Sequence, residues 1–470
     1  MTAIDGRIGE SIDDGVTRLT ERRFQRMRPF GGATPPPIDS THLPPGPRWP
    51  VAVQTIALLR FRHRFVPWAH RKYGDVFTVR TVPRGRPLVL FTRPEHAKEI
   101  FAGDPEVFHA GKGNSILGPI MGEHSLLLQD SAEHKRARKL LMPAFNGHAL
   151  RDYRALVTEV ARREISSWSP GDEFRSLDRM NALTLEVILR VVFGVTDERR
   201  LAALRPRVNA TVDVSPAVLL GWGYPWLQKF GVWKRTVENQ YELDRLMYAE
   251  IRERRDAPDL HDRTDVLSRL IRIGIDEGDP LDDTELRDQL VTLLLAGHET
   301  TATALSWALY EVGRDRALLL RCQQAADEGD DEFLDAVMKE SMRLHPVIPM
   351  VVRTLMKPAT IAGVDVPAGA TVGPSIIMAH QKSDNHPDPW RFRPERFIGQ
   401  NPPTNTWIPF GGGVRRCIGA GFSLMEGVAV LREVFAAYDV TAVGDDEPKV
   451  RNITSVPRRG ARVRVSPRRS

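Results

Sequence analysis

Apolar positions recur at helical spacing along most of the chain. This spacing predicts a helix over residues 54–73, ended by Gly74, and mainly amphipathic helices over the next 240 residues or so. The longest periodic run extends from about Asp283 to Arg314, and its ~32 residues would make a helix of roughly 48 Å. Asp282 and Glu285 have the spacing of a capping box at the start of this run. The pattern therefore predicts a mostly α-helical fold.

Short apolar runs bounded by turn residues predict a small β-sheet region with contributions from both ends of the chain. Residues 76–79 and 88–91 are expected to form a hairpin across residues 83–85. Residues 351–374 are expected to form short strands and turns, and residues 438–468 a final hairpin. No internal repeat or break in composition separates these elements. We therefore expect a single domain, mostly α with a small β-sheet region, over residues 44–470.

The first 43 residues differ from the rest. They are polar, and the prolines at positions 35–37, 44, 45 and 47 cannot continue a helix, so we expect residues 1–43 to be a disordered leader. The N-terminus has no apolar signal region, and no stretch of 18 apolar residues occurs anywhere. These absences predict a cytoplasmic protein without a transmembrane segment.

Composition adds two limits. The chain is 41% hydrophobic and 27% charged, as expected of a globular protein large enough to bury a cofactor. Its two cysteines, Cys322 and Cys417, exclude a disulfide framework and fit a reducing compartment. The net charge of +6 is a modest excess without a nucleic-acid-binding motif, so no nucleic acid is expected as a partner.

One cysteine lies among glycines, with a cation two residues before it, in the segment Phe410-Gly411-Gly412-Gly413-Val414-Arg415-Arg416-Cys417-Ile418-Gly419. Glycines let a large group approach the backbone and can adopt left-handed angles. Backbone N–H groups and nearby positive charge favour the thiolate form of a cysteine. A phosphate-binding loop is the weaker alternative, because neither of the usual glycine patterns is complete. A buried, inert cysteine is the other alternative.

The spacing Phe-Gly-x-Gly-x-Arg-x-Cys-x-Gly resembles the haem-binding signature of the cytochromes P450. The resemblance implies haem b, the iron protoporphyrin IX heme, with Cys417 as the thiolate ligand of its iron. It also implies that Arg415 contacts a haem propionate, that a helix begins near Gly419, and that Phe410 belongs to the cofactor site.

The long predicted helix contains Ala296-Gly297-His298-Glu299-Thr300, and a glycine in mid-helix costs about 1 kcal/mol relative to alanine. By the same resemblance this helix crosses the distal face of the haem, with Ala296 beside the cofactor and Glu299 and Thr300 as the acid–alcohol pair. A hydroxyl can hold a water and a carboxylate can relay protons from solvent. The alternative is threonines that bond back to their own helix.

Three further elements acquire a role only through the resemblance. Glu340 and Arg343 lie three apart on one helix face and would, with Arg396, support the loop leading to Cys417. His134 and Arg138 lie one turn apart and would contact a propionate, with Arg353 as a candidate for the second. A solvated basic helix face is the alternative for the His134–Arg138 segment.

The resemblance covers about residues 43 to 468 and implies a bacterial, actinobacterial-type haem-thiolate monooxygenase with the cytochrome P450 fold. Such an enzyme activates dioxygen with two external electrons and inserts one oxygen atom into an apolar organic substrate, here a fatty acid, terpenoid, steroid or aromatic natural product. The alternatives are a haem-thiolate peroxygenase or isomerase, and a non-catalytic haem ligand carrier or sensor.

The implied substrate pocket draws on residues 109–123, 214–226, the helix near Leu295, residues 347–351 and 454–456, which are mostly aliphatic. No flavin or iron–sulfur signature is found, so electrons would come from a ferredoxin or flavodoxin with an NAD(P)H reductase. A basic face is the predicted docking site for this partner, with a solvated charge run as the alternative; its members are Lys135, Arg136, Arg138, Lys139, Arg393, Arg396 and Arg416.

Overall fold

The computed structural model describes residues 38, 42–82, 85–195, 197–212, 228–451 and 453–468. These residues form two compact units. The first contains the described residues of Asn114–Ala149 and Leu185–Gly297, and the second those of Thr34–Gly113, Leu150–Thr184 and His298–Ser470. The leader predicted for residues 1–43 lies almost wholly outside the described residues. The expectation of a single domain stays a prediction.

The first unit is helical. Helices α8, α9 and α14 contribute residues to both units, and α14 runs without interruption through the predicted long segment. The predicted capping box is confirmed, because Glu285 N donates to Asp282 Oδ1 (2.8 Å) and Asp282 N donates to Glu285 Oε2 (3.0 Å). The helices that lie within the first unit or are shared are η1 (Ser115–Leu117), α6 (Gly118–Met121), α7 (Ser131–Leu141), η2 (Met142–Phe145), α8 (Gly147–Ser166), α9 (Ser176–Phe193), α10 (Glu198–Val212), α12 (Gly231–Arg255), α13 (Val266–Asp276) and α14 (Asp283–Val312).

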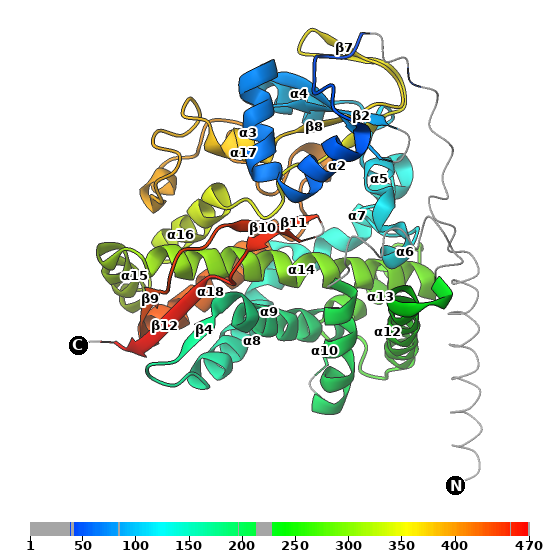
Figure 1. The fold of residues 1–470 in the computed structure, drawn as a ribbon. Coiled ribbons are helices and arrows are strands. Elements are labelled where there is room, and N and C mark those ends of the chain that lie inside the picture. Colours follow the sequence, from blue (N-terminus) through cyan, green and yellow to red (C-terminus); the bar gives the residue numbers. More distant parts are fainter. Residues whose placement is uncertain are drawn as a thin grey trace. The chain divides into compact units, whose positions relative to one another are not determined.

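The second unit holds every strand found in the described residues (Figure 1). Its largest sheet has the order β1–β2–β8–β5–β3, formed by β1 (Val76–Thr81), β2 (Arg86–Phe91), β8 (Thr371–Pro374), β5 (Arg353–Leu355) and β3 (Phe108–His109). The predicted β1–β2 hairpin is confirmed, although part of its turn lies outside the described residues. The short strands predicted over residues 351–374 are also present, and they include β6 (Ala359–Ile361) and β7 (Val364–Val366).

The end of the chain forms two antiparallel arrangements. One sheet has the order β4–β12–β9, from β4 (Glu173–Arg175), β12 (Arg462–Pro467) and β9 (Tyr438–Ala442), and β10 (Pro448–Arg451) pairs with β11 (Thr454–Pro457). The predicted terminal hairpin is therefore confirmed, with a second pair of strands inside it.

The remaining helices of the second unit include a correction. The helix predicted over residues 54–73 is two helices, α2 (Val51–Arg60) and α3 (Arg62–Tyr73), because Phe61 leaves the helical region at φ −126° and ψ 22°. Helices α15, α16 and α18 pack against one another. The others are α4 (Pro94–Ala102), α5 (Ala110–Gly113), α15 (Arg316–Glu328), α16 (Asp331–Leu344), α17 (Ile376–Gln381), η4 (Pro394–Phe397), η5 (Gly413–Arg415) and α18 (Ala420–Ala437).

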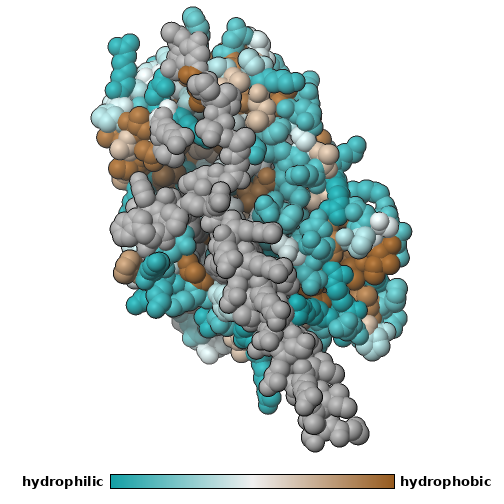
Figure 2. Space-filling view, turned by 90° about the vertical axis from the view of Figure 1, so that its right-hand side faces the viewer, coloured by the Kyte–Doolittle hydropathy of each residue, from teal (hydrophilic) through white to brown (hydrophobic). Residues whose placement is uncertain are grey.

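Apolar side chains from the large sheet and its helices form the core that positions the cysteine segment. One cluster joins Phe101 of α4 to Ile376 and Ala379 of α17 and to Ile408. Hydrophilic residues cover much of the coloured surface in Figure 2, and hydrophobic residues occur there in separate groups. Among the described residues, no helix has the length and apolar character needed to span a bilayer.

Candidate functional site

The cysteine segment is a tight loop set by its glycines. Gly411 and Gly413 have φ of 66° and 64°, in the left-handed region that favours glycine. The Cys417 N–H donates to the carbonyl of Phe410 (2.9 Å), which closes the loop. A Cβ at Gly412 would lie 2.4 Å from the ring of Phe101, and one at Gly413 would lie 2.0 Å from the Phe101 carbonyl oxygen. The close packing of α4 against this loop is therefore a second reason for these glycines.

The two cysteines lie in opposite environments. Cys417 is exposed, and two residues later Gly419 is the N-cap of α18. The positive end of this helix and the neighbouring Arg415 and Arg416 favour a thiolate. Cys322 is buried in α15, and burial raises the pKa of its thiol. A solvent-accessible sulfur beside positive charge has the donor chemistry of a haem iron ligand, and an inert core cysteine does not.

A buried charge network supports the approach to the cysteine loop. Arg343 donates to both carboxylate oxygens of Glu340 (2.6 and 2.8 Å), and Arg396 donates to Glu340 Oε1 (3.1 Å). Arg343 also donates to the carbonyl oxygens of His380 and Pro389 (2.9 and 2.7 Å). The predicted contacts among Glu340, Arg343 and Arg396 are confirmed.

Two buried histidines form hydrogen bonds with the backbone of the segment that precedes the cysteine loop. Burial lowers the pKa of His380 well below its usual value, so its Nε2 stays able to accept from the N–H of Ile408 (2.9 Å). His386 bonds the carbonyl of Thr406 (2.9 Å), and burial lowers its pKa to about 4. Ile408 in turn accepts from the N–H of Gly411 (3.1 Å). Sequence reasoning did not identify either histidine, and no motif marks them.

Helix α14 has an open stretch in its middle. Ala296 is exposed and Thr300, one turn later, is half-buried, whereas Val291–Leu294 and Ala302–Tyr310 are buried. This exposure leaves room for a large group beside that face of the helix. A Cβ at Gly297 would lie 2.9 Å from Ile188 of α9, so helix packing accounts for the mid-helix glycine.

The predicted acid has a partner that sequence reasoning missed. Glu299 is buried, and its Oε1 lies 3.4 Å from an Nη of Arg451 on β10. The Arg451 side chain is 28% exposed, so this contact joins a buried carboxylate to the surface. The neighbouring Thr301 donates its hydroxyl to Ser423 of α18 (3.0 Å) and so links α14 to the helix that follows the cysteine.

The expected cofactor residues divide between the two units. Cys417, Phe410, Arg415, Gly419, Arg353, Glu299 and Thr300 belong to the second unit, and His134, Arg138 and Ala296 to the first. Arg353 is buried on β5 and donates to the carbonyl of Val352 (2.8 Å). His134 is buried and Arg138 half-buried on α7, one turn apart. The positions of Arg353 on β5 and of His134 and Arg138 on α7 fit a role in binding an anion.

Acidic side chains pair with part of the basic run on α7. Arg136 forms two 2.8 Å hydrogen bonds with Asp279 and one of 2.5 Å with Glu285. Lys139 pairs with Glu277. In the second unit, Arg393 pairs with Asp388. Acidic partners therefore neutralise part of the predicted docking face.

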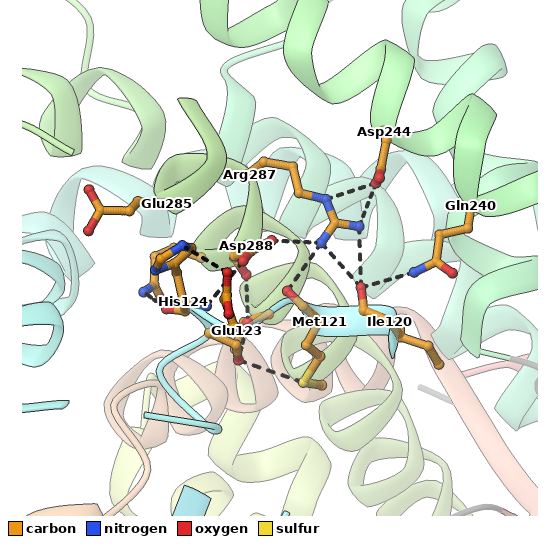
Figure 3. A network of polar contacts seen from close by, with 12 residues as sticks. Ile120, Met121, Glu123, His124, Gln240, Asp244, Glu285, Arg287 and Asp288 are labelled. Carbon is orange, nitrogen blue, oxygen red and sulfur yellow. Dashed lines mark hydrogen bonds and ion pairs between the residues drawn. The ribbon is translucent and has the colours of Figure 1, made fainter. Parts of the chain in front are cut away.

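A second buried network lies in the first unit (Figure 3). Arg287 of α14 donates to Asp244 Oδ1 of α12 (2.8 and 2.5 Å), to Asp288 Oδ1 (2.9 Å) and to the carbonyls of Ile120 and Met121. Burial alone would lower the pKa of Arg287, but the two carboxylates raise it. His124 N donates to Asp288 Oδ2 (3.1 Å). This network fastens to α14 a segment at the end of the predicted pocket loop 109–123.

The predicted pocket is described only in part. Residues 214–226 lie outside the described residues. Ser455 of β11 donates its N–H to the Val347 carbonyl (2.8 Å), so two of the predicted pocket segments meet. His63 of α3 bonds the Ser455 hydroxyl (2.7 Å), and burial lowers the pKa of His63 to about 4.

Comparisons with known proteins agree on one family. The family model described as Cytochrome P450 matches residues 44–463. A "Putative cytochrome P450 135A1" of Mycobacterium tuberculosis is 52% identical over 433 residues, which cover 92% of this chain and 96% of that protein. A "Putative cytochrome P450 135B1" of Mycobacterium bovis is 42% identical, over 91% of this chain and 92% of that protein.

A solved structure gives the same result for the fold. The "Retinoic acid bound cyanobacterial CYP120A1" superposes with a TM-score of 0.80, at 24% identity, and the match covers 91% of this chain and all of that chain. The mostly α-helical fold with small sheets is therefore confirmed.

Proposed function

Because the chain belongs to the cytochrome P450 family, whose members are monooxygenases that bind haem b, we propose that Cys417 is the thiolate ligand of the haem iron and that Thr300 and Glu299 deliver protons to the reaction site. The observation that carries the proposal is the exposed Cys417 thiol at the start of α18, in a loop closed on Phe410. When bound, the haem supplies reductive activation of dioxygen and insertion of one oxygen atom into the substrate.

Cationic side chains would hold the cofactor carboxylates. Arg353 is buried on β5, and a buried guanidinium favours a carboxylate partner. Arg415 precedes the ligand by two residues, and His134 and Arg138 share one face of α7. Phe410 and Gly419 would complete the loop around the sulfur, and the exposed Ala296 would leave space beside α14. Each assignment rests on local geometry together with the family motif.

The protons would reach the site through α14. The Thr300 hydroxyl can hold a water and donate a proton at Oγ1, and the Glu299 carboxylate can exchange protons with groups nearer the surface. Arg451 would act as a positioning residue, because its cation 3.4 Å from Glu299 Oε1 orients the carboxylate and reaches towards solvent.

The substrate would be an apolar organic molecule, such as a fatty acid, terpenoid, steroid or aromatic natural product. The aliphatic character of residues 347–351 and of the helix near Leu295 supports this class. The structural neighbour is a retinoic acid complex, and retinoic acid is an apolar carboxylic acid.

A ferredoxin or flavodoxin with its NAD(P)H reductase would supply the two electrons. Lys135 remains an exposed cation on α7, whereas Arg136 and Lys139 already contact acids. Attraction of an acidic partner would accelerate association and would weaken with salt. First-electron transfer is therefore expected to slow as salt rises, and Lys135→Glu with Lys139→Glu should slow it further in stopped-flow reduction.

The ligand assignment is tested by Cys417→His. We expect the variant to lose the red-shifted Soret band of the reduced carbonyl complex even where haem stays bound, because that band requires thiolate ligation. Cys322→Ala should keep the band, since Cys322 is buried in α15. Retention of the band in Cys417→His would reject Cys417 as the ligand.

The proton path is tested at two positions. Thr300→Ala is expected to consume reductant but release hydrogen peroxide in place of product, and Thr300→Ser should restore coupling because it keeps the hydroxyl. Arg451→Gln should lower kcat with little change in KM, and Arg451→Lys should recover much of it. Product formation by the wild-type protein without a reductant would instead favour a peroxygenase.

A further inference from the structure

Helix α2 buries two polar side chains and leaves three large apolar side chains at the surface. Gln54, Thr55 and Leu58 are buried, and the exposed residues include Val53, Ile56 and Leu59. An ordinary surface helix turns most of its apolar residues to the core, so this distribution is unusual.

The buried polar residues of α2 form hydrogen bonds with backbone groups. Gln54 accepts from Arg80 N (2.8 Å) and donates to the carbonyls of Pro47 and Trp49 (3.0 and 2.8 Å), and Thr55 accepts from Val82 N (3.0 Å). These bonds satisfy backbone groups next to β1, the edge strand of the large sheet. Because this face of α2 is used to cover the sheet edge, its apolar residues are left at the surface.

The exposed apolar residues are concentrated around this helix. Val82 is tied to Thr55, and Arg62 donates to the Ile453 carbonyl (3.2 Å), which brings both exposed residues to the same helices. These seven are half of the fourteen large hydrophobic residues exposed in the described part of the chain. We call them the α2 surface: Trp49, Val53, Ile56, Leu59, Phe61, Val82 and Ile453.

The charge on the chain segment that carries most of the α2 surface is positive. Residues 42–74 contain no Asp or Glu, and their exposed residues include five cations. Arg64 is paired with Glu447 across from it. The exposed cations of this stretch are Arg48, Arg60, Arg64, Arg71 and Lys72.

We propose that the α2 surface docks on the headgroup region of an anionic lipid bilayer. Apolar residues with tryptophan on one face and arginine or lysine beside them are the features of a helix that lies in a membrane interface. The basic rim complements anionic headgroups, which attract such segments. A second copy of the chain fits less well, because a symmetric contact would bring the same acid-free basic segments together.

The test is sedimentation of the purified full-length holoprotein with vesicles. We expect it to bind phosphatidylglycerol–phosphatidylcholine vesicles, to bind them less as salt rises, and to bind phosphatidylcholine vesicles much less. Ile56→Glu with Leu59→Glu should reduce binding about tenfold or more. Leu320→Glu is the matched control, because Leu320 on α15 is 51% exposed and Leu59 is 49% exposed. This control should bind as the wild type does.

Arg48→Gln with Arg60→Gln should weaken binding to anionic vesicles and reduce its salt dependence. Equal binding of the double glutamate variant and the Leu320→Glu control would overturn the proposal, as would equal binding to neutral and anionic vesicles. The wild-type protein could also sediment without vesicles. If the double glutamate variant does not do so, the α2 surface binds a second copy of the chain and not a bilayer. The assay counts bound protein and not turnover, so it can fail or succeed independently of the proposed function.

Discussion

Each unit buries a network of arginine and carboxylate side chains, and the two networks carry opposite excess charge. In the second unit, Glu340 is the one carboxylate between Arg343 and Arg396, so cations exceed anions by one. In the first unit, Arg287 pairs with two carboxylates, Asp244 and Asp288, so in the ion pairs seen among the described residues the anions exceed the cations by one. Arg343 and Arg287 are both fully buried.

The two networks share one feature, which is that the buried arginine also forms hydrogen bonds with backbone carbonyls. Arg287 donates to those of Ile120 and Met121 in α6, and Arg343 donates to those of His380 in α17 and Pro389. A buried charge that loses its partner destabilises the fold by about 3–5 kcal/mol, whereas removal of an excess charge costs much less. The comparison therefore predicts that the outcome of a substitution depends on which charge remains.

Arg287→Met is expected to have the largest effect. It removes the cation that pairs with both Asp244 and Asp288, so we expect a loss of about 5 kcal/mol, at the top of the range for such breaks. The free energy of unfolding in urea measures it. Arg245→Met is the control, because Arg245 forms an exposed pair with Glu242, and pairs of this kind contribute about 0–1 kcal/mol. A loss no larger than that of the control would mean that the carboxylates are not held by Arg287.

Arg343→Met should cost less, about 3 kcal/mol, because Arg396 still contacts Glu340 Oε1. Its effect on the haem content should be greater than that of Arg287→Met, because the carbonyls of His380 and Pro389 lose their hydrogen-bond donor. Urea unfolding and the haem content of the purified protein measure the two effects. The exposed Arg393, paired with Asp388 at 3.5 Å, supplies the control Arg393→Met. A larger destabilisation than that of Arg287→Met would contradict the charge argument.

The same comparison shows what the sequence can predict. Glu340 and Arg343 lie three residues apart on one helix, so their contact follows from helical geometry, and the motif suggests its role. Arg287 meets Asp244 43 residues away and Ile120 167 residues away, and no local pattern encodes such contacts. The pairing of Glu299 with Arg451 was missed for the same reason.

Local patterns also fail where tertiary structure overrides them. Helical periodicity predicted one helix through Phe61, but the chain turns there into a second helix. Periodicity alone would place Val53 and Ile56 in the core, whereas the hydrogen-bonding needs of the sheet edge turn Gln54 and Thr55 inward. The capping box joins residues three apart and was predicted correctly. The terminal strands pair over a longer stretch of chain, but each one is marked by its own short apolar run, and they were also predicted correctly.

His386 gives the cysteine-side network a dependence on pH. Burial lowers its pKa to about 4, below the value near 6.5 of an unfolded chain, so the unfolded chain binds the proton first as pH falls. Stability is therefore full at neutral pH and is lost between about pH 6.5 and 4, by about 2 kcal/mol at pH 5 from this residue. Urea unfolding of wild type and His386→Asn at pH 7 and 5 measures the difference.

Asp244→Asn should have the smallest effect. The variant removes the excess negative charge of the first network, and its amide oxygen can still accept from Arg287 at the position of Oδ1. Arg287 then remains balanced by Asp288, so we expect a change within about 1 kcal/mol.

Glu340→Gln is the counterpart of Asp244→Asn in the second network and separates charge from hydrogen bonding. It also exchanges a carboxylate for an amide, but it leaves Arg343 and Arg396 without an anion, so about 3 kcal/mol should be lost. Urea unfolding of both variants at one pH compares them directly. Similar losses would show that hydrogen bonds, and not the sign of the excess charge, govern the two networks. A tolerated Asp244→Asn beside a destabilising Glu340→Gln would show that a fully buried arginine needs one carboxylate, and that the second carboxylate of the first network adds little to stability.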